Sequence, residues 1–215
     1  MKRFCYRAQY RDEEALRRAA ELGAHVEGLL REEKLLSATV FGYDARNLFL
    51  YYECAGETLE PGAVFPGLEP YLCGWPGEEE PRYFLPMTEL YHSYAPDGEE
   101  QAAWRRQTPV EPVAMMSRMV PEKLASYIFY HFQRQEEQPA SEGRHLSIWG
   151  DGATTLLYDE LPELPVAHPR AGLLAPRHHT PENWREIMLP HFRLFEDGEV
   201  YHNARVLLTR SHADL

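Results

Sequence analysis

The sequence predicts an α+β protein made of two tandem ferredoxin-like repeats that form an intrachain dimeric α+β barrel. Three observations lead to this prediction. Strand and helix patterns follow the order β-α-β-β-α-β twice along the 215 residues, which is the order of a ferredoxin-like unit. The two halves share a similar hairpin, about 108 residues apart. A stretch rich in turn-forming residues separates them. The expected domains are therefore 1–95, a linker at 96–112, and 113–215.

The first half opens with a strand at 2–10, followed by a helical pattern. Between 12 and 34, apolar residues recur at spacings of three and four, with Arg and Glu in the gaps. Two strands are expected next, at 37–41 and 48–53, because β-branched and aromatic residues flank a run of turn formers. An irregular stretch rich in Gly and Pro then leads to a strand at 84–94.

The second half repeats this order. Pro121 is suited to the first turn of a helix, and the sequence Gly-Asp-Gly-Ala at 150–153 is a strong hairpin signal. The predicted elements are a strand at 113–119, a helix from 121 to about 138, strands at 145–149 and 154–159, a short helix at 184–191 and a strand at 200–209.

The clearest internal match pairs ATVFGYDARNLFLYYE with LSIWGDGATTLLYDE. Both segments have a small residue, an aromatic residue and Gly before the turn, and an aliphatic residue, Tyr and an acid after it. The long period indicates duplication of a whole domain rather than a solenoid. A second copy can cover the face or edge that one sheet leaves open.

Composition restricts the classes of partner. The formal net charge of −12 argues against nucleic acid and against an anionic membrane surface, since both need a basic face. The three cysteines are sparse and form no CxxC pair, and the N-terminus lacks a secretory signal. We therefore expect a cytoplasmic protein whose partner is a small neutral molecule.

The best candidate site lies on the second-half helix. Tyr127 and His131 are four residues apart and so share one face with Leu124, which indicates that this face points inward. An imidazole can pass protons near neutral pH, a phenol can orient a hydroxyl, and a nearby Trp offers a flat wall to a ring. The alternative interpretation is a satisfied, partly buried histidine beside a core tyrosine.

The chain resembles the L-rhamnose mutarotase-like proteins, which are small dimeric α+β barrels. In the first half the resemblance runs from KRFCYRAQ through YDARNLFLYYE to ELYHS. In the second half it lies in PEKLASYIFYH, HLSIWGDGATTLLYDE and ENWREIM. The resemblance implies an intrachain version of that barrel, acting on a small sugar without a cofactor. It also implies a monomer with an internal pseudo-dimer, or a homodimer.

The resemblance also implies roles for particular residues. In the family a His on the first helix donates a proton and a Tyr one turn before it contacts the sugar, which correspond to His131 and Tyr127. Trp184 corresponds to one member of a Trp pair on the short helix. The first-half helix has Ala15 and Ala19 at the equivalent positions, so its site is expected to be lost.

Departures from the family pattern suggest a different ligand. The family has a Tyr on its second strand, where this chain has Leu146 in the second half and Ala38 in the first half. The first half matches the family's Trp pair only through Trp75. The first hypothesis is therefore a sugar mutarotase or epimerase that uses His131 for acid/base catalysis, with Tyr127 and Trp184 as substrate contacts. The second is a non-catalytic ligand-binding or interaction protein. An oxygenase on the same barrel is a third class, reached by analogy of fold alone.

Two observations would separate the first two hypotheses. An open, polar pocket beside Tyr127, His131 and Trp184 would favour the enzyme. A pocket filled by bulky side chains would favour the interaction protein, and the residues in question are Phe129, Phe132 and Trp149.

Other histidines are weaker candidates. His178 and His179, with Glu182 and His191 downstream, lack a recognised metal-ligand spacing, so no metal is expected. Because side chains alternate between the two faces of a strand, either His202 or Arg205 on the last strand could reach the pocket.

Overall fold

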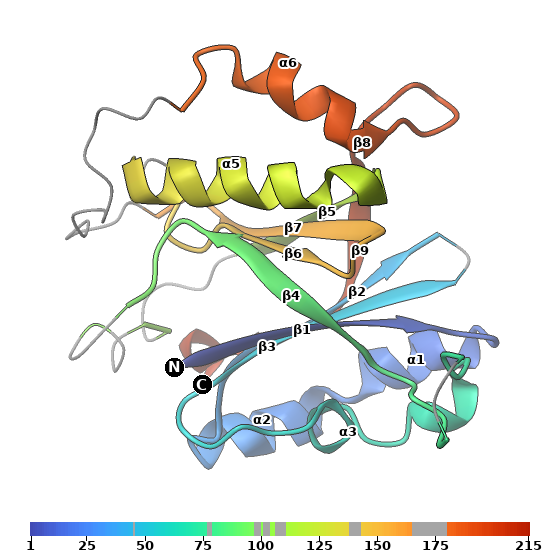
Figure 1. Ribbon diagram of the computed structural model, residues 1–215. Helices are drawn as coiled ribbons and strands as arrows, with labels where there is room; N and C mark the ends of the chain where they lie inside the picture. The colour runs from blue at the N-terminus through green and yellow to red at the C-terminus, as the bar shows by residue number, and fades with distance from the viewer. Residues whose placement is uncertain are drawn as a thin grey trace. The chain divides into compact units, whose positions relative to one another are not determined.

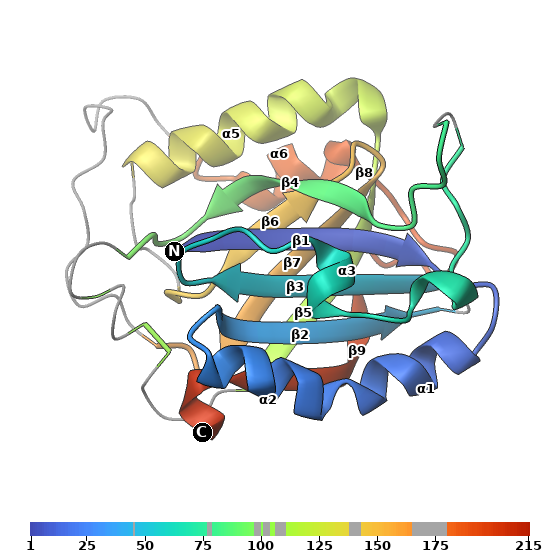
Figure 2. The same ribbon diagram turned by 90° about the horizontal axis from the view of Figure 1, so that it is seen from below.

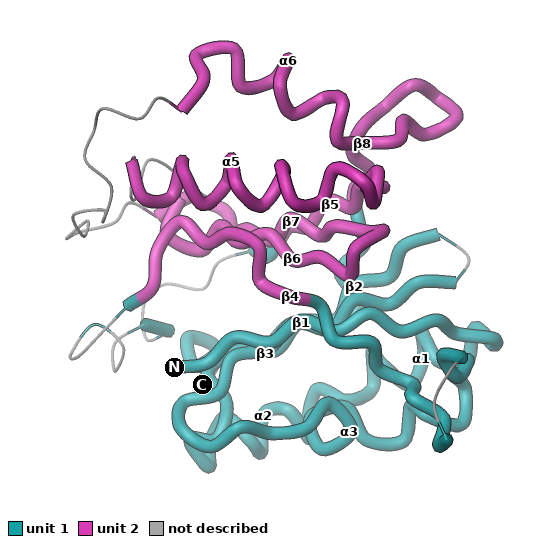
Figure 3. Tube along the Cα trace, viewed as in Figure 1, with its two compact units in different colours: residues 1–87, 96–112, 204–215 teal, residues 88–95, 113–203 magenta. Residues whose placement is uncertain are grey.

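The computed structural model describes residues 1–44, 46–76, 79–96, 100, 104–105, 111–137, 143–164 and 180–215. The chain divides into two compact units (Figure 3). Unit 1 comprises Met1–Met87, Pro96–Pro112 and Ala204–Leu215, and unit 2 comprises Thr88–Ala95 and Val113–Asn203. The units differ from the predicted repeats at their ends, since 88–95 belongs to unit 2 and 204–215 to unit 1.

Antiparallel strands form the centre of unit 1. They are β1 (Lys2–Gln9), β2 (Leu35–Tyr43), β3 (Asn47–Cys54), the start of β4 (Leu85–His92) and most of β9 (His202–Ser211). β3 pairs with β1 and with β2, and every residue of β3 is buried. Both neighbours of β3 are strands, and its faces are covered, which explains its almost continuous apolar and aromatic sequence.

Helices cover one face of these strands. α1 (Glu14–Glu21) and α2 (Gly23–Arg31), with the short α3 (Pro61–Val64), lie against β1, β2 and β3 (Figures 1 and 2). The sequence predicted one helix over 12–34, whereas the structure interrupts it at Leu22. Ala15 and Ala19 are fully buried in this core. Their small side chains pack the helix against the sheet, as expected for a half without a Tyr–His pair.

Unit 2 holds the second set of elements. They are most of β5 (Glu111–Met119), η2 (Pro121–Lys123), α5 (Leu124–Glu137), β6 (Ser147–Gly150), β7 (Thr154–Leu161), α6 (Trp184–Met188), η3 (Leu189–His191) and β8 (Phe192–Arg193). β6 and β7 form the predicted hairpin. Its turn is stabilised because Asp151 Oδ1 accepts hydrogen bonds from two backbone N–H groups, and Gly152 takes the positive φ of 94° that glycine tolerates.

The predicted fold class is wrong. Instead of two tandem ferredoxin-like repeats forming an intrachain dimeric α+β barrel, the strands hydrogen bond in one antiparallel order, β7-β6-β4-β1-β3-β2-β9-β5-β8. β7 also pairs with β5, so eight strands close into a single antiparallel β-barrel with few helices. A long β4 serves two ladders, pairing with β1 through Leu85–Met87 and with β6 through Thr88–His92. Unpaired strand edges are costly, and the pairing of β7 with β5 covers an edge of each of these two strands.

No helix in the described part of the chain combines the length and the apolar character that crossing a membrane requires.

Candidate functional site

Helix α5 positions the two residues that the sequence singled out. Tyr127 and His131 are buried, at 3% and 5% exposure, while Phe129 and Phe132 on the other side of the helix are 59% and 48% exposed. The spacing of four residues places Tyr127 and His131 on the same inward face, as predicted. The two phenylalanines therefore do not fill the space beside His131.

Aromatic contacts bring the three predicted site residues together. The Tyr127 and His131 ring centres lie 4.1 Å apart, and His131 meets Trp184 of α6 edge-on at 5.0 Å. Tyr91 of β4 contacts the same imidazole at 5.7 Å. A buried imidazole held by three aromatic rings has a fixed position.

The hydrogen bonding of His131 defines its tautomer. Nδ1 lies 2.9 Å from the Tyr127 carbonyl oxygen. Because a carbonyl can only accept, Nδ1 must carry the proton, and in the neutral ring Nε2 is then the acceptor. Among the described residues no hydrogen bond to Nε2 is found. His131 therefore offers an unused acceptor inside the protein.

Burial keeps this imidazole neutral. Desolvation lowers the pKa of His131 to about 4, and the nearby charge of Arg134 acts in the same direction, although the bond to the Tyr127 carbonyl opposes it. Desolvation also raises the pKa of the Tyr127 hydroxyl well above its ordinary value. Both groups are therefore uncharged at neutral pH.

A cavity of about 110 Å³ opens beside His131. Aromatic and aliphatic residues form most of its wall, and the lining residues that carry polar side-chain groups include three tyrosines, one threonine, His131 and Arg134. The lining residues all belong to unit 2: Tyr91, Tyr127, His131, Arg134, Leu146, Ile148, Thr155, Leu157, Trp184, Met188, Phe192 and Tyr201. Leu146, which stands where the family resemblance placed a tyrosine, contributes an apolar surface.

Trp149 lies outside this cavity. Its indole Nε1–H donates to Ser147 Oγ at 2.9 Å in the buried part of β6. None of the three bulky residues proposed to fill the pocket does so.

The remaining histidines are dispersed. His191 is buried near the pocket, with Nδ1 donating to the carbonyls of α6 and Nε2 2.8 Å from Ser126 Oγ. His202 instead pairs with Asp197 at 3.0 Å. His178 and His179 lie outside the described residues. In the part of the chain that the structure describes, no group of three potential ligands could hold a metal ion.

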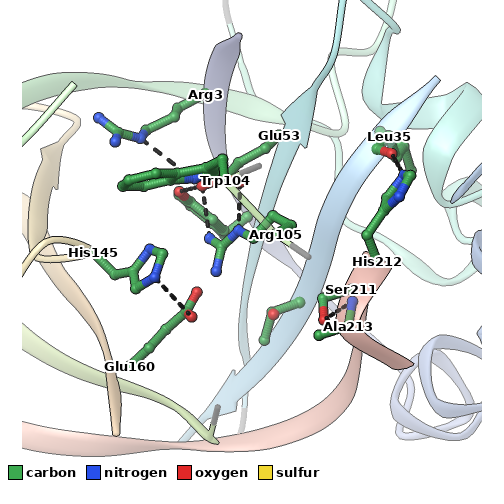
Figure 4. Close-up of polar contacts among 12 residues, drawn as sticks. Arg3, Leu35, Glu53, Trp104, Arg105, His145, Glu160, Ser211, His212 and Ala213 are labelled. Carbon is green, nitrogen blue, oxygen red and sulfur yellow. Dashed lines mark hydrogen bonds and ion pairs between the residues drawn. The ribbon is translucent and has the colours of Figure 1, made fainter. Parts of the chain in front are cut away.

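Sequence reasoning missed two buried carboxylates, shown in Figure 4. In unit 1, Glu53 accepts two hydrogen bonds from Arg105 at 2.7 Å, one from Trp104 and one from Tyr51. Burial alone would raise the pKa of Glu53, but Arg105 and Arg3 outweigh it and hold that pKa far below its ordinary range.

The second buried carboxylate is Glu160 of unit 2, and Tyr158 is its partner as Tyr51 is the partner of Glu53. Tyr158 donates to it at 2.5 Å, and His145 Nε2 lies 3.7 Å away. The shared Tyr-x-Glu ending of the two matched hairpins was the available signal, because residues i and i+2 of a strand face the same side.

Comparisons with known proteins give little guidance. No family model and no curated protein matches the chain. A solved structure from Fusobacterium nucleatum, described as a putative monooxygenase, is similar at 10% identity over 97% of this chain and 93% of that chain, with a TM-score of 0.44. Similarity at this level transfers neither fold nor function.

The description derived from the family resemblance is corrected accordingly. Ferredoxin-like tandem repeat and dimeric α+β barrel do not describe this chain, because its strands form one closed antiparallel barrel. The terms isomerase and mutarotase-like protein find no support, since no family model and no curated protein matches the chain. At neutral pH an imidazole with a pKa of about 4 carries no proton on Nε2, so this nitrogen of His131 acts as an acceptor.

Proposed function

We propose that the protein binds a small molecule containing a flat ring in the unit 2 pocket. One observation carries this proposal: the free acceptor Nε2 of buried His131 stands among aromatic rings that line an open cavity. Ligand sites are typically concave and apolar, with a few polar groups that fix the ligand's orientation. The pocket beside His131 has this composition.

The size of the cavity limits the ligand. Pockets for drug-sized molecules range from roughly 300 to 1,000 Å³, and an apolar cavity of about 150 Å³ holds benzene. A cavity of about 110 Å³ that opens to solvent suits a single ring or a smaller group. The aromatic walls favour a flat ring, which can stack on or meet the edges of Tyr127 and Trp184.

His131 would fix the orientation of the ligand. A hydroxyl or amine on the ring can donate to Nε2, and a hydrogen bond of this kind contributes about 0.5–1.5 kcal/mol. A catalytic role for His131 stays a prediction. If it transfers protons at neutral pH, it does so as a base through Nε2.

The test uses isothermal titration calorimetry with phenol and toluene, which have nearly the same shape but differ in the hydroxyl donor. We expect phenol to bind several-fold more tightly than toluene, and His131→Ala to abolish this preference. Phe132→Ala, on the exposed side of the same helix, is the matched control and should leave both affinities unchanged.

A pocket-filling variant completes the test. Leu157→Trp should block both compounds while the thermal melting of the protein remains cooperative. If neither compound binds the wild type, or if Leu157→Trp binds both as well as the wild type does, the pocket is not the binding site.

We also propose a cytoplasmic location. The chain carries only Cys5, Cys54 and Cys73 and no CxxC pair, which is typical of proteins from reducing compartments. Cell fractionation that recovers the protein outside the cytoplasm would contradict this.

A further inference from the structure

We propose that the ligand carries a second polar group, a hydrogen-bond acceptor, and that the hydroxyl of Tyr201 donates to it. This inference rests on the proposed function and narrows the class of ligand to a single ring with a donor for His131 and an oxygen-bearing substituent for Tyr201. Both residues line the cavity. Tyr201 is 42% exposed, and it is the one exposed residue among the described residues of the lining, so it stands at the opening.

The local chain direction turns Tyr201 towards the cavity. Tyr201 directly precedes β9, and neighbouring residues of an extended chain point to opposite sides. The next residue, His202, is held away from the cavity, because it stacks on Phe195 at 3.7 Å and pairs with Asp197 at 3.0 Å. The sequence left open whether His202 or Arg205 reaches the pocket. In the described part of the chain neither lines it, and Tyr201 does.

A row of aromatic rings separates the two polar groups of the cavity. Tyr201 meets Phe192 edge-on at 5.4 Å, and Phe192 meets Tyr127 edge-on at 5.6 Å. Tyr127 in turn lies 4.1 Å from His131. One end of this row is a buried imidazole, and the other end is the tyrosine at the opening. A ligand that reaches both ends therefore needs a polar group on each side of its ring.

The hydroxyl of Tyr201 is available to a ligand. Among the residues that the structure describes, no hydrogen bond to this hydroxyl is found. Desolvation raises its pKa above the ordinary value, so the hydroxyl keeps its proton at neutral pH and can donate it. A tyrosine hydroxyl that is withdrawn from water usually has a hydrogen-bond partner. An acceptor on the ligand would supply that partner.

The test compares 4-(hydroxymethyl)phenol with 4-ethylphenol by isothermal titration calorimetry at neutral pH. The two compounds are uncharged and have nearly the same shape, and both keep the ring hydroxyl for His131. Only the first has an oxygen acceptor on its substituent. Because the compounds differ in hydrophobicity, the quantity compared is the effect of Tyr201→Phe on the affinity for each. This variant keeps the ring that packs on Phe192.

We expect Tyr201→Phe to weaken the binding of 4-(hydroxymethyl)phenol by about twofold to tenfold, as the loss of one hydrogen bond implies. The affinity for 4-ethylphenol should stay unchanged. Tyr130→Phe is the matched control, because Tyr130 is a partly buried tyrosine of α5 that contacts His191 and does not line the cavity. It should leave both affinities as they are in the wild type.

Two results would overturn the role of Tyr201 while the proposed pocket stands. In the first, Tyr201→Phe leaves the affinity for 4-(hydroxymethyl)phenol unchanged. In the second, it weakens both compounds by the same factor. Failure of both compounds to bind the wild type would instead refute the proposed function itself.

Discussion

At the scale of single residues, the burial of His131 should make the stability of the protein depend on pH. Its pKa in the folded protein is lowered to about 4 by burial, whereas an exposed histidine titrates near 6.5. Between these values the unfolded chain binds more protons than the folded one. The stabilising contribution is therefore complete above about pH 6.5 and is lost as the pH falls toward 4.

This predicts that the free energy of unfolding drops by on the order of 3 kcal/mol more in the wild type than in His131→Gln between these two pH values. Urea unfolding at several pH values measures the difference. Parallel pH profiles for the two proteins would show that the imidazole is not buried and neutral as described.

The buried ion pair between Glu53 and Arg105 leads to a second prediction at the scale of single residues. Removing one partner of a buried ion pair leaves an uncompensated charge, so Arg105→Ala should lower the free energy of unfolding by about 3–5 kcal/mol. Arg17→Ala is the control, because its ion pair with Glu14 is half exposed and such surface pairs contribute about 0–1 kcal/mol. Urea unfolding at pH 7 compares the two, and equal losses would argue against the buried network.

The contribution of Glu53 to stability changes with pH in the opposite direction to the one that burial alone would give. Because Arg105 and Arg3 lower its pKa in the folded state, its contribution is complete above the ordinary pKa of a glutamate and is lost only as the pH falls into the acid range. The Arg105→Ala deficit should accordingly shrink at low pH.

At the scale of elements, the two faces of α5 should contribute differently to the free energy of unfolding. Its inner face carries Tyr127 against His131 and Phe192, while its outer face exposes Phe129. Tyr127→Ala should cost about 3–5 kcal/mol of stability, as for other buried aromatic residues, and Phe129→Ala about 0.5 kcal/mol or less. Thermal unfolding distinguishes them, and a large loss in Phe129→Ala would mean that the outer face is covered.

Local signals in the sequence predicted most elements but not every boundary. The 150–153 turn follows from Asp151 and Gly152, which act on neighbouring backbone. The interruption at Leu22 has no comparable local signal. A Cβ at Gly23 would lie 3.0 Å from the guanidinium of Arg210, so a side chain from the far end of the sequence packs against the helix at this point.

The candidate site was predictable only in part, for the same reason. Helical periodicity placed Tyr127 and His131 on one face, and the family resemblance pointed to Trp184. Arg134 was missed, because only the position of Trp184 in space shows that its guanidinium faces the cavity. Tyr91 was missed because it comes from a strand whose partner is β6.

At the scale of the whole molecule, the order of elements did not determine how strands pair. Alternation of side chains shows which face of a strand is buried, but not which strand lies beside it. β4 continues from β1 to β6, and β7 pairs with both β6 and β5. These long-range pairings close the barrel, and two separate repeats would not contain them.

The central claim is that a small ring binds beside His131, and the chain has a built-in reporter for it. Of the four tryptophans, Trp184 lines the cavity, whereas the indole N–H groups of Trp104 and Trp149 donate to Glu53 and Ser147. The measurement is a ¹H–¹⁵N NMR titration of the indole signals with phenol, each signal being assigned from its Trp→Phe variant. We predict a saturable shift of the Trp184 signal, with the signals of Trp75, Trp104 and Trp149 nearly unchanged. A titration that leaves Trp184 in place, or that shifts the other indoles instead, would contradict the account.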